Sequence, residues 1–262
     1  MKLFVFDIDG TLVPFGENVI PEPTKAALNA LLNRGDIVCL ASGRPYIGIK
    51  RFFDTLVNGH KYIIGSNGAA LFTYEGNKIY ESTIKKSDFI RLYDRYHRSD
   101  LNVYAYDDQN GIAYYAFDKW IEFELTVNHM TKTYKMTDEK DASRLTSIHK
   151  VMLASEPNVS KNIRLDDDDY HQFNVMRSSK SYLEILPKEA DKGICVDALV
   201  KHLNMDKRDV FTFGDGGNDI GMISKYTGIA MENAVDELKV HAKHITKSVE
   251  EYGVKFALEN LI

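Results

Sequence analysis

The sequence predicts an α/β fold in which a core with a parallel sheet carries an inserted α+β domain. Near both ends of the chain, short apolar runs that stop at small polar residues alternate with amphipathic helical segments, which is the pattern of parallel βαβ units. Between them, strand-like segments of alternating polarity favour an antiparallel sheet. We therefore expect a Rossmann-like core from residues 1–83 and 187–262, and an inserted domain from residues 84–186.

The first strand is expected at residues 3–6, an apolar run that stops at Asp7. Asp9 follows two residues later, and Gly10 allows the backbone to bend sharply there. Two carboxylates this close repel each other unless a cation or a shared proton neutralises them. Because Mg²⁺ prefers oxygen ligands, a magnesium site is one interpretation of this turn, and a plain Asx-turn at a strand end is the other.

Two further strand–helix units follow in the first part of the chain. Helices are expected at residues 21–33 and 47–56, and strands at residues 36–41 and 61–64. The two strands stop at Ser42-Gly43-Arg44-Pro45 and at Gly65-Ser66-Asn67-Gly68. Residues 70–83 are expected to form a hairpin, because Tyr74-Glu75-Gly76-Asn77 separates two β-rich runs.

The inserted domain begins with an expected helix at residues 88–98 and contains a second one at residues 118–128. The clean alternation of its strands predicts a sheet with one face covered by helices and the other exposed. Its many tyrosines fit sheet packing, and they also fit a wall against which a sugar ring could lie. The acidic run at residues 166–169 is expected to be a solvated loop.

The α/β pattern resumes at Pro187. A helix is expected at residues 191–205, since apolar residues recur there at helical spacing. A strand at residues 209–213 then stops at Gly214-Asp215-Gly216-Gly217-Asn218-Asp219. Two short strands and a final helix complete the core.

Composition narrows the class of protein. The chain has 262 residues, a formal net charge of -5 and no long basic run, which argues against a nucleic-acid or anionic-membrane surface. No signal-peptide pattern and no apolar run of about 20 residues is found, so we expect a cytoplasmic protein. Cys39 and Cys195 are each flanked by apolar residues and are expected to be reduced and buried.

Chemistry-bearing residues gather at the expected strand ends. In a parallel sheet these ends meet at one edge, where open α/β folds bind their ligands. The carboxylates, amides, hydroxyl and ammonium that would converge there suit a metal ion and a phosphoryl group. They are Asp7, Asp9, Ser42, Asn67, Lys192, Asp215, Asn218 and Asp219.

Four of these segments, in this order, resemble the motifs of the haloacid dehalogenase superfamily, and most closely its Cof-type sugar-phosphate phosphatases. They are Asp7-Ile8-Asp9-Gly10-Thr11, Ser42-Gly43-Arg44-Pro45, Lys192-Gly193 and Gly214-Asp215-Gly216-Gly217-Asn218-Asp219. The inserted domain falls where that branch carries its C2-type cap. The resemblance implies a phosphoric monoester hydrolase that requires Mg²⁺ and acts on a small phosphate ester. The charge of the chain, not the resemblance, is the reason to expect no nucleic-acid or membrane partner.

The resemblance also implies a role for each matching residue. Asp7 would be the nucleophile that becomes an aspartyl phosphate, and Asp9 the acid/base, with its backbone carbonyl on the metal. Asp7, Asp9 and Asp215 would bind Mg²⁺, and the phosphoryl group would be bound by Ser42, Gly43, Lys192 and Asn218. Supporting positions are Thr11, Arg44, Asn67 and Asp219. Capping a helix is an equally good interpretation for Asn218 and Asp219, as is shaping the turns for Gly43, Arg44 and Asn67.

Two other functions use the same residues. A phosphosugar mutase would form the same aspartyl phosphate and pass the phosphoryl group to a sugar instead of water. A non-catalytic sensor would bind a sugar phosphate and a protein partner, although it would have no need of Asp9. The sequence does not name the substrate, the protein partners or the oligomeric state.

Overall fold

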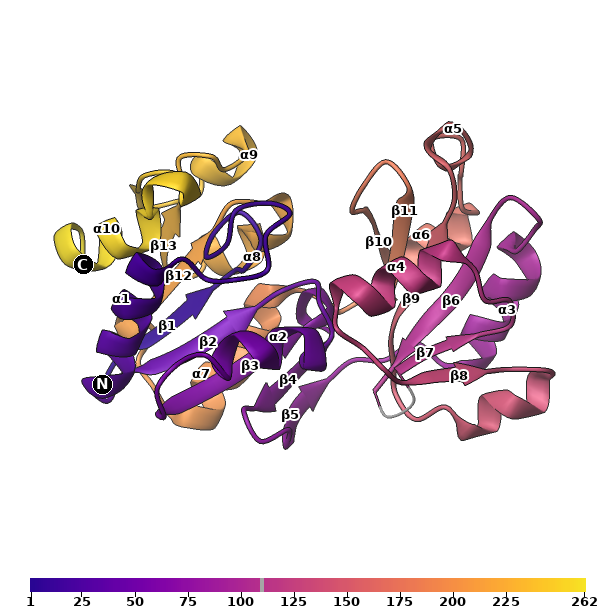
Figure 1. Ribbon diagram of the computed structural model, residues 1–262, viewed down its shortest axis with the longest axis horizontal. Coiled ribbons are helices and arrows are strands. Elements are labelled where there is room, and N and C mark those ends of the chain that lie inside the picture. Colours follow the sequence, from indigo (N-terminus) through magenta and orange to yellow (C-terminus); the bar gives the residue numbers. More distant parts are fainter. Residues whose placement is uncertain (109–110) are drawn as a thin grey trace. The chain divides into compact units, whose positions relative to one another are not determined.

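The computed structural model describes residues 1–108 and 111–262, which form two compact units (Figure 1). The first unit comprises Met1–Glu81 and Asp191–Ile262, and the second comprises Ser82–Ala190. Each unit has a sheet of its own. In these described ranges, no helix is both long enough and apolar enough to cross a membrane.

The first unit is built on an eight-stranded sheet with the order β14-β13-β12-β1-β2-β3-β4-β5. Neighbouring strands are parallel except in the β3–β4 and β4–β5 pairs, which are antiparallel. The strands are β1 (Leu3–Phe6), β2 (Ile37–Ala41), β3 (His60–Gly65), β4 (Ala70–Thr73), β5 (Lys78–Glu81), β12 (Val210–Gly214), β13 (Thr227–Ala230) and β14 (His244–Ile245). The predicted α/β fold with a parallel-sheet core is confirmed.

The register of the central strands decides where the polar residues meet. Phe6 of β1 pairs with Leu40 of β2 on one side and with Phe213 of β12 on the other. All three strands therefore end at the same edge of the sheet, although β12 lies about 200 residues further along the chain. The residues that follow these strands emerge side by side.

Helices cover both faces of this sheet, so its central strands can be apolar along their whole length. The right-handed crossover rule places α1 and α2 on one face and α8 on the other, because β1 to β3 and β12 to β13 run in opposite directions along the sheet. In agreement, α1 contacts α10, while α7 contacts α8. The helices are α1 (Glu22–Asn33), α2 (Tyr46–Phe53), α7 (Lys192–Leu203), α8 (Ile220–Ile223), α9 (Asp236–Lys239) and α10 (Gly253–Asn260).

Local predictions for the first unit hold. The hairpin predicted within residues 70–83 is β4 and β5, whose turn is closed by a hydrogen bond from Thr73 N to Asn77 O at 2.9 Å. Cys39 and Cys195 are free and buried, as predicted from their apolar neighbours.

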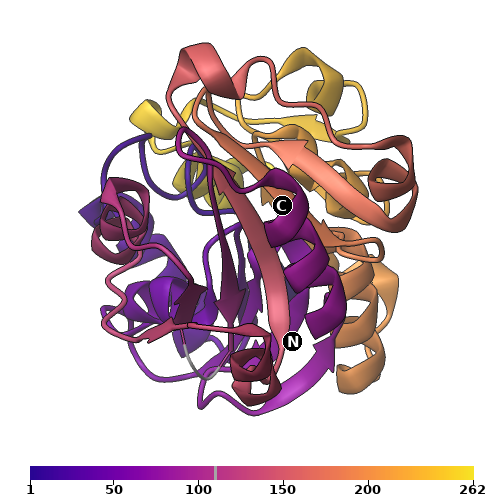
Figure 2. The same ribbon diagram turned by 90° about the vertical axis from the view of Figure 1, so that its right-hand side faces the viewer.

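The second unit contains a six-stranded sheet with the order β10-β11-β9-β6-β7-β8, antiparallel except for the β7–β8 pair. In Figure 2, helix α3 (purple) lies over one face of this sheet. The strands are β6 (Asn102–Asp107), β7 (Gly111–Tyr114), β8 (Thr133–Lys135), β9 (Ile148–Ala154), β10 (Phe173–Arg177) and β11 (Tyr182–Pro187), and the helices are α3 (Lys86–Tyr96), α4 (Lys119–Val127), α5 (Pro157–Ser160) and α6 (Asp167–Gln172).

The prediction that one face of this second sheet would be exposed is wrong. Phe89 and Leu92 of α3 pack against one face, while Ile121 of α4 packs with Tyr104 and Tyr106 on the other. The reason is the parallel β7–β8 pair, because parallel neighbours need a crossover, and α4 supplies it over the second face. The strand pattern alone gives no sign of that parallel pairing.

The acidic run at residues 166–169 is solvated at its first three residues, as predicted, but it is not a loop. It forms the start of α6, and the Asp169 side chain is fully buried. Asp169 accepts hydrogen bonds from Arg91 at 2.6 Å and from the Tyr96 hydroxyl at 2.5 Å, and both donors lie on α3. Partners more than 70 residues away thus compensate the burial of this charge, as a buried carboxylate requires.

Candidate active site

The turn after β1 is held tightly in place. Asp7 N donates to Phe213 O at 3.0 Å, which ties the end of β1 to β12. Gly10 has φ +88°, and a Cβ atom there would lie 2.3 Å from an oxygen of Asp215, so only glycine fits. Thr11 donates to the other carboxylate oxygen of Asp215 at 3.1 Å. The first turn is therefore shaped around Asp215.

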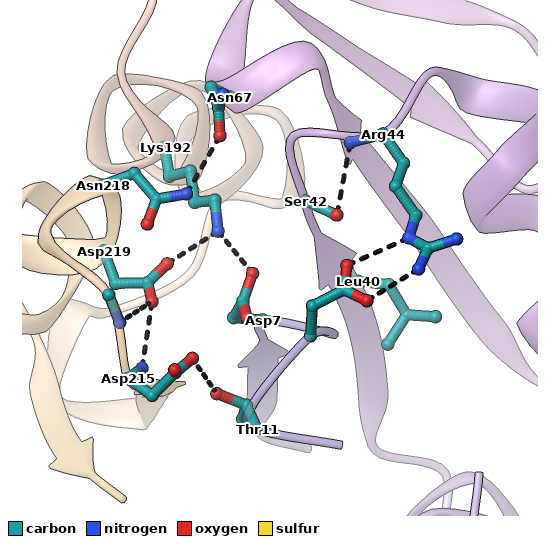
Figure 3. A network of polar contacts seen from close by, with 12 residues as sticks. Asp7, Thr11, Leu40, Ser42, Arg44, Asn67, Lys192, Asp215, Asn218 and Asp219 are labelled. Atoms are coloured by element: carbon teal, nitrogen blue, oxygen red, sulfur yellow. Dashed lines mark hydrogen bonds and ion pairs between the residues drawn. The ribbon is translucent and has the colours of Figure 1, made fainter. Parts of the chain in front are cut away.

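Three buried carboxylates meet at this edge of the sheet. One oxygen atom each of Asp7, Asp215 and Asp219 lies within 4.8 Å of the others. Figure 3 shows the ammonium of Lys192 between Asp7 and Asp219. It donates a hydrogen bond of 2.6 Å to each carboxylate. Lys192 is fully buried at the start of α7. We call these four residues the carboxylate cluster.

The charges of the carboxylate cluster are not balanced by its own residues. Burial raises the pKa of Asp7 well above its ordinary value, against the opposing effect of Lys192. Burial and the Asp219 carboxylate raise the pKa of Asp215 to about 6. Burial acts to lower the pKa of Lys192, but Asp219 and Asp7 raise it overall. One ammonium cannot neutralise three ionised carboxylates, so the cluster can accept a further cation. Its oxygen donors fit a hard divalent cation such as Mg²⁺.

Asp219 has two structural contacts besides Lys192. Its second oxygen accepts from the backbone N–H groups of Asp215 and Gly216, both at 3.0 Å. The residue thus holds the turn after β12 and at the same time carries negative charge into the cluster. Sequence analysis gave it a supporting place, and the structure brings it, like Asp215, within 4.8 Å of Asp7.

The turns after β2 and β3 lie next to each other. Ser42 Oγ accepts from the backbone N–H of Arg44 at 3.2 Å, and Asn67 N donates to Ser42 O at 3.0 Å. Asn67 adopts left-handed backbone angles, with φ 55° and ψ 33°, and its side chain accepts from Asn218 at 2.9 Å. A Cβ atom on Gly43 would lie 3.1 Å from the Asn67 side chain, so this turn packs closely.

The turn after β3 also fixes the position of Lys192. A Cβ atom on Gly68 would lie 2.3 Å from the backbone carbonyl of Asp191, so the turn packs directly against the start of α7. Asp191 caps that helix by accepting from Ile194 N at 2.9 Å. The start of α7 is therefore held in place, and from it the Lys192 side chain extends into the carboxylate cluster.

Asp9 lies apart from the three clustered carboxylates and has its own partner. Arg44 Nε donates to one carboxylate oxygen of Asp9 at 2.9 Å, and Arg44 Nη2 donates to the other at 2.6 Å. About a third of the Asp9 side chain is exposed, whereas the three clustered carboxylates are buried. Such a two-point pair fixes both the position and the orientation of a carboxylate.

Comparison with known proteins shows the family of the chain. The family model for haloacid dehalogenase-like hydrolases matches residues 4–258. The chain belongs to the haloacid dehalogenase-like hydrolases. The Cof-type resemblance predicted from the four motifs is thereby confirmed, and so is the expected class of enzyme, a phosphoric monoester hydrolase.

Relatives of this hydrolase include a putative phosphatase, YxeH, of Bacillus subtilis, which is 31% identical with 100% of this chain and 98% of the relative covered. An HMP-PP phosphatase of Yersinia pseudotuberculosis is 27% identical, with 91% and 86% covered. Among solved structures, a haloacid dehalogenase-like hydrolase from Bacteroides thetaiotaomicron superposes with a TM-score of 0.87 at 27% identity, with 100% and 99% covered.

Some residues of the hydrolase site were not found by sequence analysis. Asn233 donates to Gly10 O at 2.9 Å and so holds the first turn from 223 residues away. Beside Asp9, Asn18 accepts hydrogen bonds from Arg44 and from Arg51. No local pattern marks these three residues. Asp191 could have been found, since an Asp directly before an expected helix is a cap signal.

Proposed function

We propose that the protein is a Mg²⁺-dependent phosphatase that hydrolyses small phosphate monoesters, sugar phosphates among them, through an aspartyl phosphate on Asp7. The observation that carries the proposal is the carboxylate cluster, which combines a buried candidate nucleophile, an ammonium and excess negative charge. Phosphatase relatives that cover nearly the whole chain support the reaction type.

The cluster suits Mg²⁺ held by Asp7, Asp215 and the backbone carbonyl of Asp9, with Asp219 supporting the site. When bound, the ion would neutralise the carboxylates and phosphoryl oxygens so that one anion can approach another. Lys192 adds a fixed positive charge at Asp7. Ser42, Asn218 and the backbone at Gly43 offer hydrogen-bond donors for the remaining phosphoryl oxygens.

The reaction proceeds in two steps. A carboxylate oxygen of Asp7 attacks phosphorus, and the bond from phosphorus to the ester oxygen breaks as Asp9 gives that oxygen a proton. Asp9 must therefore enter this step protonated, with one of its two oxygens released from Arg44. Asp9 then takes a proton from water, whose oxygen attacks the phosphorus of the aspartyl phosphate. The bond between phosphorus and Asp7 breaks, which releases inorganic phosphate and restores the Asp7 carboxylate. One water is consumed and no proton is gained or lost by the enzyme.

The two units divide the work in this proposal. Residues 1–83 and 187–262 act as the catalytic core, and residues 84–186 act as a C2-type cap that selects the leaving group. The cap contributes aromatic side chains such as Trp120, Phe123 and Tyr182, whose rings pack together in the second unit. A cap that excludes water from the reaction is a common device in such enzymes.

The test is release of phosphate from a panel of sugar, nucleotide and cofactor phosphates with Mg²⁺ and with EDTA. Asp7→Asn should abolish Mg²⁺-dependent release, and Asp206→Asn, a change at an exposed ion pair, should leave it unchanged. Retained release in Asp7→Asn would refute the assigned nucleophile. An isomerised sugar phosphate in place of free phosphate would indicate a mutase, and tight binding without turnover would indicate a sensor.

A further inference from the structure

The loop that follows β13 connects the turn after β1 with the turn after β12. It comprises residues 231–235, and we call it the β13 loop. Val235 N donates to Asp215 O at 2.9 Å. From the same loop, the Asn233 side chain donates to Gly10 O at 2.9 Å. The two turns that carry the candidate metal ligands are therefore held by one short segment.

The side chain of Asn233 has a fixed orientation. Its Oδ1 accepts from Val249 N at 2.9 Å, while its Nδ2 donates to Gly10 O. A backbone N–H can only donate and a backbone carbonyl can only accept, so these two partners admit one orientation of the amide. Val249 is buried at the start of a short 3₁₀ turn, Val249–Glu251. The bond to Gly10 O is therefore made from an anchored position.

Hydrogen bonds fix the peptide groups on both sides of Gly10. Gly10 N donates to Val13 O at 2.8 Å, which fixes the peptide group that joins Asp9 to Gly10. The Asp9 carbonyl belongs to that planar group and points the opposite way from the Gly10 N–H. Asn233 fixes the next peptide group, which carries Gly10 O. Since a glycine backbone turns easily, these two bonds restrict the direction of the Asp9 carbonyl.

We propose that Asn233 is a positioning residue for the metal site, which sets the Asp9 carbonyl relative to Asp215 and thereby favours Mg²⁺ over Ca²⁺. This inference rests on the proposed function, in which both residues are ligands of Mg²⁺. Mg²⁺ requires a nearly ideal octahedron of ligands at about 2.0 to 2.1 Å, whereas Ca²⁺ accepts flexible geometries at about 2.3 to 2.6 Å. A change that loosens the spacing of two ligands should therefore weaken Mg²⁺ binding more than Ca²⁺ binding.

A purely structural role for Asn233, as an anchor for the segment that begins at Val249, makes a different prediction. Loss of the anchor would lower the melting temperature, and the folded protein would still bind both ions as the wild type does. The ratio of the dissociation constants for Ca²⁺ and Mg²⁺ separates the two roles, because general destabilisation does not change it. Asn233 is exposed, so its replacement creates no cavity.

The experiment measures both dissociation constants by calorimetry in metal-free protein without substrate. The wild type should bind Mg²⁺ more tightly than Ca²⁺. Asn233→Ala should lower the ratio of the Ca²⁺ constant to the Mg²⁺ constant by about 3- to 10-fold, the range for one neutral hydrogen bond. Asn260→Ala removes another exposed amide bond, to Phe256 O at 2.8 Å, and should keep the wild-type ratio. The melting temperature in EDTA shows that each variant is folded.

Asn233→Asp isolates the bond to Gly10. The carboxylate can still accept from Val249 N but cannot donate to Gly10 O, and its added charge acts alike on two divalent ions. The ratio should therefore fall as it does in Asn233→Ala. A wild-type ratio in both variants would overturn the inference. A fall in Asn233→Ala alone would overturn it too, because the effect would then come from the bond to Val249.

Failure of the proposed function gives a different result. If the wild type binds Mg²⁺ but releases phosphate from no ester, the proposed function fails, and the ratio still decides the role of Asn233. If Mg²⁺-dependent release is found and the ratio is unchanged in the variants, the proposed function stands and the inference fails. A wild type that prefers Ca²⁺, or that binds neither ion, would also overturn the inference.

Discussion

Asp215→Asn should stabilise the metal-free protein near neutral pH, although it should abolish turnover. Asp215 is buried beside Asp219, and its pKa is raised from 3.8 to about 6. An acid whose pKa is raised by folding favours the folded state while it is protonated, and this advantage is lost as the pH rises through about 6. An asparagine side chain has no charge to bury, so the variant avoids this loss.

The size of the effect follows from the same shift. A rise from 3.8 to about 6 is about 2 pKa units, and each unit corresponds to about 1.4 kcal/mol. Ionised Asp215 therefore lowers the free energy of unfolding of the metal-free protein by about 3 kcal/mol. Asparagine keeps an oxygen that can accept the hydrogen bond from Thr11, so that contact need not be lost. We expect Asp215→Asn to raise the free energy of unfolding by about 1 to 3 kcal/mol at pH 7.5.

The assay is urea unfolding followed by circular dichroism in EDTA at pH 7.5 and pH 4.5. The gain of Asp215→Asn should be full at pH 7.5 and fall to about a third at pH 4.5, where Asp215 is protonated in the folded protein but still mostly ionised in the unfolded chain. Asp236→Asn, at a fully exposed carboxylate, is the control and should change stability by less than about 0.5 kcal/mol. Mg²⁺ should stabilise the wild type much more than Asp215→Asn. A loss of stability in Asp215→Asn at pH 7.5, or an equal gain at both pH values, would refute the reasoning.

Two further predictions concern the same site. Lys192→Met leaves Asp7 and Asp219 buried without their ammonium. The free energy of unfolding in EDTA, measured by the same urea assay, should therefore fall by about 3 to 5 kcal/mol. Unchanged stability would contradict the assigned ion pairs. Gly10→Ala and Gly16→Ala both strain a left-handed backbone, and each should cost about 1 kcal/mol or more, but only a Cβ atom at Gly10 would clash with Asp215. Gly10→Ala alone should therefore weaken the activation of phosphate release by Mg²⁺, and equal weakening by both changes would contradict this account.

The sequence predicts the centre of the site because its parts follow strands. Parallel strands end at one edge, and the polar residues directly after an apolar run must therefore gather there. Asp7, Asp215 and Lys192 were placed together on this basis, although up to 208 residues separate them, and the structure brings them within hydrogen-bond distance or a few ångströms. Strand topology, which the alternation of helices and strands predicts, is sufficient for this result.

The remaining contacts depend on details that no local pattern contains. Arg44 was expected to line the site or shape its turn. Its partner Asp9 is 35 residues away, and the contact depends on the conformation of the long Arg44 side chain. Asn233 reaches Gly10 O from a loop without a motif. The covered second face of the inserted sheet was missed for a similar reason, since the β7–β8 pairing is parallel and their sequences do not show it. Pair contacts of this kind are fixed by tertiary packing.

The central claim, that Asp7 carries the phosphoryl group, is tested most directly with the Asp9→Asn variant and p-nitrophenyl phosphate, whose leaving group departs without a proton. Because Asp9 is needed to activate water, we predict a burst of one nitrophenolate per active site, followed by slow turnover, and mass spectrometry of the acid-quenched protein should locate the phosphoryl group on Asp7. A reaction without a burst, in which Asp7 carries no phosphoryl group or another residue carries it, would contradict the account.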